Sequence, residues 1–126
     1  MNVEATFARM SRELDFLQGT LDVLVLRALT WGPMHGYGVA SFIRRGSTGS
    51  FNVLDGALYT ALHRLEERGW VESEWGNSDK KKRAKFYRLT PAGRRALRAE
   101  TQSWNDYVAA VARVMTASPD PGEVSS

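Results

Sequence analysis

The sequence contains a short run in which almost every residue is basic. It consists of Lys80, Lys81, Lys82, Arg83 and Lys85. Ammonium and guanidinium groups at this density can bind the phosphates of a nucleic-acid backbone. Most such runs are only solvated loops, so the elements that position this one decide between the two interpretations.

A segment with helical periodicity, residues 53–70, precedes the basic run. Its apolar residues recur at the spacing of one helix face. They are Leu58, Ala61, Leu62 and Leu65. Asp55 can cap the first turn, and Gly69 suits the left-handed position just past the last turn. The pattern therefore predicts a helix from Asp55 to Arg68.

The outer face of this predicted helix carries small, hydroxyl-bearing and basic side chains. They are Ala57, Tyr59, Thr60, His63 and Arg64. A face of this kind fits the major groove of DNA, where Arg64 could bind guanine or a phosphate. Arg64 could equally pair with Glu67 three residues later. An ordinary amphipathic helix that only covers a core is the alternative interpretation.

After Gly69 the pattern changes to the period of two that is typical of strands. Residues 71–75 and 86–89 alternate in this way, and the turn-rich residues 76–83 join them. These segments predict a β-hairpin with the basic run at its tip. At the tip of a hairpin directly after the helix, phosphate contact is favoured over a solvated loop.

Three more helices are predicted before residue 53. The first covers residues 1–17 and must pack on another surface, because a lone helix of this length is marginal in water. The second, residues 20–31, is apolar nearly all round and forms the core; Gly32 and Pro33 end it. The third opens at Met34 and runs to about Arg45, and residues 51–53 are extended.

A long C-terminal helix is predicted over residues 91–116. Thr90 supplies a capping hydroxyl and Pro91 the first helical position. Apolar residues recur along the helix at heptad-like spacing. They are Leu97, Trp104, Tyr107, Val108, Val111, Val114 and Met115. A small domain cannot cover such a seam, so a second copy of the chain is expected to do so, and residues 117–126 are expected to be a disordered tail.

Composition excludes several classes of function. The chain has 126 residues, 43% of them hydrophobic, which suits one small domain. It has no cysteine and only two histidines, so neither a disulfide nor a metal site is predicted. No nucleophile–base–acid set and no phosphate-binding glycine loop is present, so we expect neither an enzyme nor a cofactor. No segment has the pattern of a membrane span or a secretory signal.

Together these elements predict a mainly α fold with a small β-hairpin. Residues 18–90 are expected to form a winged helix-turn-helix, flanked by the N-terminal helix and by the C-terminal dimerisation helix. The order, spacing and charge placement favour binding of double-stranded DNA. A winged helix that uses its basic hairpin on an acidic protein partner is the alternative.

Three motifs resemble those of the PadR-like transcriptional regulators, over residues 17–115. They are GPMHGY at 32–37, GALYTALHRLE at 56–66 and FYRLTPAGR at 86–94. The resemblance implies a cytoplasmic, homodimeric bacterial regulator of the short-tailed subfamily, usually a repressor, that responds to a small molecule or to stress. It also implies that the Tyr59 hydroxyl binds a phosphate, against the alternative of a packing aromatic. The family usually has serine in place of Ala57 and proline in place of Thr60.

The resemblance gives Trp104 a second possible role. Some relatives stack flat aromatic compounds between the two symmetry-related copies of this tryptophan. An effector site at Trp104, next to Val108, would bind a planar aromatic molecule. Asp22 could border the same space or could simply mark the exposed edge of its helix. Plain packing in the dimer interface is the alternative role for Trp104.

Overall fold

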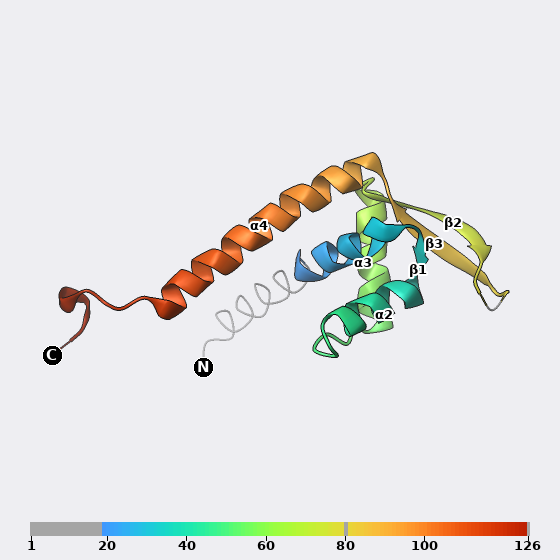
Figure 1. The fold of residues 1–126 in the computed structure, drawn as a ribbon. Coiled ribbons are helices and arrows are strands. Elements are labelled where there is room, and N and C mark those ends of the chain that lie inside the picture. Colours follow the sequence, from blue (N-terminus) through green and yellow to red (C-terminus); the bar gives the residue numbers. More distant parts are fainter. Residues whose placement is uncertain (1–18, 80, 126) are drawn as a thin grey trace, which may run out of the picture.

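The computed structural model describes residues 19–79 and 81–125 (Figure 1). The predicted helix over residues 1–17 lies outside this part of the chain. A helix over residues 19–28 is followed by the 3-10 helix η1 (Leu29–Trp31), the strand β1 (Met34–His35) and the helices α2 (Gly36–Gly46) and α3 (Asp55–Glu67). The strands β2 (Val71–Asn77) and β3 (Arg83–Leu89) then lead to the long helix α4 (Pro91–Thr116) and the 3-10 helix η2 (Pro121–Glu123). The chain is therefore mainly helical with one small sheet, as the sequence predicts.

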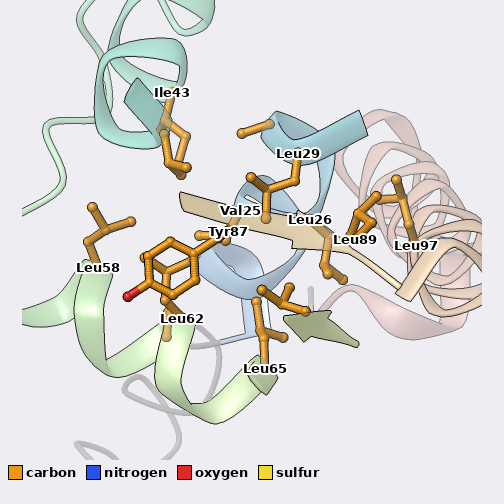
Figure 2. Packing of buried hydrophobic residues seen from close by; sticks show 14 residues of the cluster. Val25, Leu26, Leu29, Ile43, Leu58, Leu62, Leu65, Tyr87, Leu89 and Leu97 are labelled. Carbon is orange, nitrogen blue, oxygen red and sulfur yellow. The ribbon is translucent and has the colours of Figure 1, made fainter. Parts of the chain in front are cut away.

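The 19–28 helix lies at the centre of the core. Val25 and Leu26 are completely buried, and Leu29 of η1 is almost so. Figure 2 shows the leucines of α3 packing toward these residues, with Tyr87 of β3 beside Leu62. The prediction that the second helix forms the core is confirmed, because its nearly continuous apolar surface is covered from several sides.

The strand β1 corrects the predicted start of the third helix. Met34 and His35 do not open the helix but pair with Tyr87 and Phe86 of β3. The His35 backbone is extended, and its Nδ1 accepts a hydrogen bond from the Gly38 amide at 3.0 Å. His35 is therefore both the last residue of β1 and the N-cap of α2. Because β1 pairs with β3, the sheet has three strands in the order β1-β3-β2.

The helix α3 begins and ends close to the predicted residues. Its N-cap is Leu54, so the prediction that Asp55 caps the helix is wrong. Asp55 is the first helical residue, where its carboxylate lies near the positive end of the helix dipole. At the other end, Gly69 has φ of 76°, and the amides of Gly69 and Trp70 donate to Glu66 and Leu65. This is the glycine-terminated helix end that the sequence predicts.

The hairpin confirms the predicted wing. The strands β2 and β3 pair in antiparallel register from Val71 opposite Leu89 to Asn77 opposite Arg83. Each strand is longer than predicted, and the connection is correspondingly shorter. In that connection the Ser78 amide donates to the Lys82 carbonyl at 2.8 Å, which closes the tip.

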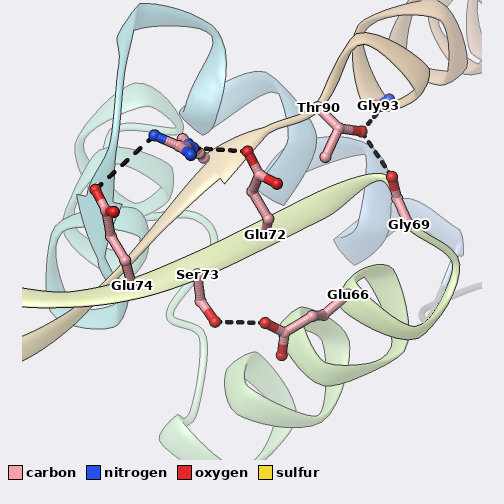
Figure 3. Close-up of polar contacts among 8 residues, drawn as sticks. Glu66, Gly69, Glu72, Ser73, Glu74, Thr90 and Gly93 are labelled. Carbon is pink, nitrogen blue, oxygen red and sulfur yellow. Dashed lines mark hydrogen bonds and ion pairs between the residues drawn. The ribbon is translucent and has the colours of Figure 1, made fainter.

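Thr90 joins the wing and α3 to α4. Its Oγ1 accepts a hydrogen bond from the Gly93 amide at 3.0 Å and donates one to the Gly69 carbonyl at 2.6 Å (Figure 3). The predicted cap is thus confirmed. A Cβ on Gly93 would lie 1.9 Å from the Trp70 carbonyl oxygen, so only glycine allows α4 to begin this close to the end of α3.

Beyond α4 the chain differs from the disordered tail predicted for residues 117–126. Residues 121–123 form η2, and its N-cap Asp120 and third residue Glu123 form a capping box, with Pro121 between them. The sequence Asp-Pro-Gly-Glu contains this local signal, which the polar composition of the segment obscured.

Candidate nucleic-acid interface

The outer face of α3 is the first part of the candidate interface. Ala57, Tyr59, Thr60 and His63 are all exposed, as the periodicity predicts. The His63 imidazole lies 3.2 Å from the Glu67 carboxylate one turn later. The face therefore offers a methyl group, two hydroxyls and an imidazole to any surface that α3 meets.

Tyr59 is half exposed and half packed. A Cβ on Gly36 would lie 2.6 Å from the Tyr59 hydroxyl oxygen, so the phenol lies directly against the start of α2. The exposed remainder of the ring is still available to a ligand of the α3 face. A side chain at position 36 would therefore displace the end of the Tyr59 ring from the start of α2.

Arg64 differs from the rest of the predicted set because its side chain turns back into the domain. Its Nε and Nη2 donate to the two carboxylate oxygens of Asp22, at 3.1 and 2.5 Å. The Arg64 side chain is only 22% exposed. The hydrogen bond to Asp22 raises the pKa of the Arg64 guanidinium above its usual value. The alternative pairing with Glu67 is wrong, since Glu67 contacts His63 instead.

Arg68 is a residue that the sequence analysis missed. Its Nη1 lies 3.6 Å from Asp22, so two arginines from the end of α3 face one carboxylate. Asp22 belongs to the largely apolar 19–28 helix and is itself nearly buried. A buried carboxylate requires a cation, and that requirement was the available signal.

The wing tip forms the second part of the candidate interface. Lys81, Lys82 and Arg83 are exposed and Lys85 is partly so, whereas Lys80 lies outside the described residues. Lys81 has a left-handed backbone, with φ of 58°. The Arg83 guanidinium lies over the exposed ring of Trp75 on the neighbouring strand, 5.2 Å from its centroid. The sequence analysis did not assign Trp75, whose indole holds Arg83 at the tip.

The base of the wing is neutralised internally. Arg88 of β3 donates to Glu72 of β2 at 2.8 Å, and Glu74 lies 3.9 Å from the same guanidinium. Ser73, between the two glutamates, donates to Glu66 of α3 (Figure 3). Among the described residues, the positive charges of the hairpin that form no ion pair therefore lie toward its tip.

A family model now decides the identity of the chain. The model of the transcriptional regulator PadR-like family matches residues 25–99, from the last turn of the core helix to the first turns of α4. The chain belongs to this family. It is a transcriptional regulator and not an enzyme, and membership of the PadR-like family implies that it binds DNA.

Individual relatives agree with this assignment. The chain is 28% identical over 90 residues to "Uncharacterized protein X" of Lysinibacillus sphaericus, over 71% of this chain and 83% of the relative. A transcriptional regulator from Clostridium thermocellum superposes with a TM-score of 0.71 at 27% identity, over 79% of this chain and 96% of that one. A PadR family regulator from Eggerthella lenta DSM 2243 gives a TM-score of 0.69 at 29% identity, over 92% and 100% of the two chains.

In this PadR-like regulator α4 extends beyond the rest of the domain (Figure 1). Its second half exposes a stripe of large apolar side chains. They are Trp104, Tyr107, Val108, Val111, Val114 and Met115. The rings of Trp104 and Tyr107 stack at 5.9 Å between centroids. Leu97 does not belong to this stripe, contrary to the prediction, because it is buried in the core of its own domain.

Asp22 was predicted to border an effector site at Trp104, and its surroundings differ from that expectation. Its carboxylate is bound by Arg64 and Arg68, in a hollow of about 190 Å³ whose lining residues do not include Trp104.

Among the described residues no group of three or more His, Asp or Glu could hold a metal ion. No helix in the described part of the chain is long and apolar enough to cross a bilayer.

Proposed function

We propose that this PadR-like regulator is a repressor that binds a two-fold-symmetric duplex DNA site as a homodimer. In this proposal α3 enters the major groove and presents Ala57, Tyr59, Thr60 and His63 to the bases and phosphates. Lys81, Lys82 and Arg83 at the wing tip bind the backbone, together with Lys85 and, from the sequence, Lys80. Arg64 acts differently, because its guanidinium is bound to Asp22.

One observation carries the DNA-binding mode. In the part of the chain that the structure describes, no carboxylate pairs with Lys81, Lys82 or Arg83 at the tip, whereas Arg88 at the base is bound by Glu72 and Glu74. A wing that served only as a solvated loop would have no need of this asymmetry. Phosphate contacts account for it, because each neutralised phosphate releases a bound cation from the DNA.

The apolar stripe on α4 supports the homodimer. Trp104, Val108 and Val111 lie on one face of a helix and are each more than a third exposed. Contiguous apolar surfaces of this kind are typical of interfaces between subunits. The proposed interface consists of Trp104, Tyr107, Val108, Val111 and Met115.

The stacked pair of Trp104 and Tyr107 supports a role in effector binding. The two flat rings could stack on a planar aromatic molecule at the dimer interface, next to Val108. Such a ligand would act on DNA affinity by favouring one separation of the two α3 helices over another.

Selection of bound fragments from random duplex DNA tests the proposed function and identifies the operator. We expect an inverted repeat whose half-sites are separated by one helical turn or a multiple of it. Affinity for the selected site that does not exceed affinity for a scrambled site would reject sequence-specific binding. That result would favour an acidic protein partner for the wing.

A further inference from the structure

A cleft of about 400 Å³ opens between the core helix and the first half of α4. Its lining residues come from the 19–28 helix, η1 and α4. They are Arg27, Thr30, Arg94, Leu97, Arg98, Thr101, Gln102 and Asn105. Small-molecule sites usually have volumes of about 300–1,000 Å³, so the cleft is large enough for a metabolite.

Three of the lining residues are arginines, and none is acidic. Within the described ranges no carboxylate forms an ion pair with Arg27, Arg94 or Arg98. Arg27 instead lies over the ring of Trp31, 5.2 Å from its centroid. Arg64 and Arg88, by contrast, are bound by carboxylates. The cleft therefore has an excess of positive charge that the described residues do not balance.

Thr30, one of the residues that line the cleft, has a hydroxyl without a partner in the described part of the chain. The Thr30 hydroxyl oxygen is buried and makes no hydrogen bond in the described part of the chain. Buried hydroxyls nearly always have a partner, from the protein or from a bound molecule. Thr101 and Asn105, one turn apart on α4, add donors and acceptors on the α4 side of the cleft.

We propose that this cleft binds a small molecule with at least two negative charges, presented by phosphate or carboxylate groups. The planar fork of arginine matches both groups with paired hydrogen bonds. A molecule with one negative charge would leave most of the charge of the three guanidinium groups unbalanced. Leu97 provides an apolar wall for the remainder of the molecule. The site is separate from the stacking surface proposed at Trp104, which is not among the lining residues.

Calorimetric titration of the full chain without DNA tests this proposal independently of the proposed function. The probes are inorganic pyrophosphate and glutarate, each titrated at constant ionic strength in chloride. We expect saturable binding of one molecule per chain for at least one probe. The tighter probe identifies phosphate or carboxylate as the preferred group. Absence of saturable binding of both probes would overturn the proposal.

Variants of the α4 arginines distinguish a defined binding site from general electrostatic attraction to the helix. Arg94→Gln combined with Arg98→Gln should weaken binding of the tighter probe at least tenfold, and Arg98→Gln alone should weaken it several-fold. Arg95→Gln removes the same charge from a neighbouring exposed position that does not line the cleft, so binding should stay within twofold. Circular dichroism and thermal melting of each variant establish that it is folded.

Two outcomes would contradict the site. Equal weakening by Arg95→Gln would mean that the probe senses only the net charge of α4. Unchanged probe binding in the Arg98→Gln variant, with a shallower salt dependence of DNA binding, would mean that these arginines contact DNA phosphates instead.

Discussion

The Asp22 carboxylate accepts two hydrogen bonds from the Arg64 guanidinium, across 42 residues of sequence. The pair joins the core helix to the last turns of α3, and Arg68 lies beside it. Because both side chains are mostly buried and have little contact with water, each charge is stabilised chiefly by the other. The orientation of the proposed recognition helix is thus held by a polar contact as well as by its leucines.

Asp22→Ala should destabilise the domain, because it leaves the Arg64 charge partly buried without its carboxylate. We expect the free energy of unfolding to fall by about 2 kcal/mol, less than the roughly 3–5 kcal/mol of a fully buried pair. Urea denaturation of the purified protein measures this change. Glu67→Gln is the matched control, since it breaks only the exposed contact with His63 and should change stability by less than about 0.5 kcal/mol. An equal change in the free energy of unfolding for the two variants would show that the Asp22–Arg64 pair does not stabilise the position of α3.

Neutralising the wing tip should weaken DNA binding without regard to sequence. In the variant Lys81→Gln with Lys82→Gln, affinity for selected and scrambled DNA should fall together. The slope of log affinity against log salt should become shallower by up to about 0.9 for each phosphate that the variant no longer neutralises. Fluorescence anisotropy over a series of salt concentrations gives the slope.

Arg113→Gln is the control for the wing variant. It removes a positive charge from the exposed far end of α4, away from the hairpin. Its slope should equal that of the unmodified protein. A slope that the wing variant leaves unchanged would mean that the tip is a solvated loop.

A charge placed in the apolar stripe of α4 should dissociate the proposed homodimer. Val111→Glu is suited to this test because Val111 is exposed in the single chain, so its replacement leaves the core intact. We expect a folded monomer by light scattering, with weaker binding to a two-fold operator. Arg113→Glu, on the opposite face of the helix by its spacing, should remain dimeric. A dimer that survives Val111→Glu would move the interface to another surface.

Trp104→Ala tests the proposed stacking site. Planar aromatic compounds are first screened by tryptophan quenching, in a variant whose other tryptophans, Trp31, Trp70 and Trp75, are phenylalanine. For a compound that releases the protein from DNA, Trp104→Ala should abolish release while changing DNA affinity much less. Release of the variant at an unchanged concentration of compound would leave Trp104 as a packing residue only.

Tyr87 should make stability depend on pH in the alkaline range. Burial, and then the negative charge of Glu66, raise the pKa of the Tyr87 phenol above its ordinary value of 10.0. Above pH 10 the unfolded chain therefore loses this proton while the folded chain keeps it, so the free energy of unfolding falls as pH rises. In urea denaturation, the free energy of unfolding of the Tyr87→Phe variant should fall less steeply with pH over that range. Parallel curves for the two proteins would contradict this role of Tyr87.

The sequence predicts those parts of the fold that depend on local patterns. The period of Leu58, Ala61, Leu62 and Leu65 is enough to place α3, and Thr90 with Pro91 is enough to begin α4. The strand β1 could not be predicted in this way. Its two residues form a strand only because β3 lies beside them.

The candidate site was predictable to the same extent. Exposure of the α3 face follows from its period, but the Asp22–Arg64 pair joins residues that no local pattern connects. Leu97 shows the related limit of a heptad pattern. The spacing identifies an apolar side chain, but it does not distinguish burial within one chain from burial between two.

The Thr90 hydroxyl, which bridges Gly69 and Gly93, makes α4 a lever with its pivot at the end of α3. With 26 residues, the arm is about 39 Å long, so a tilt of about 5° moves its far end by about 3 Å. The start of α4 has no room to move at Gly93, because the helix begins in contact with the Trp70 carbonyl. A small displacement at the far end would therefore reach α3 as a rotation, and Gly93→Ala would loosen the pivot at the point where that rotation is transmitted.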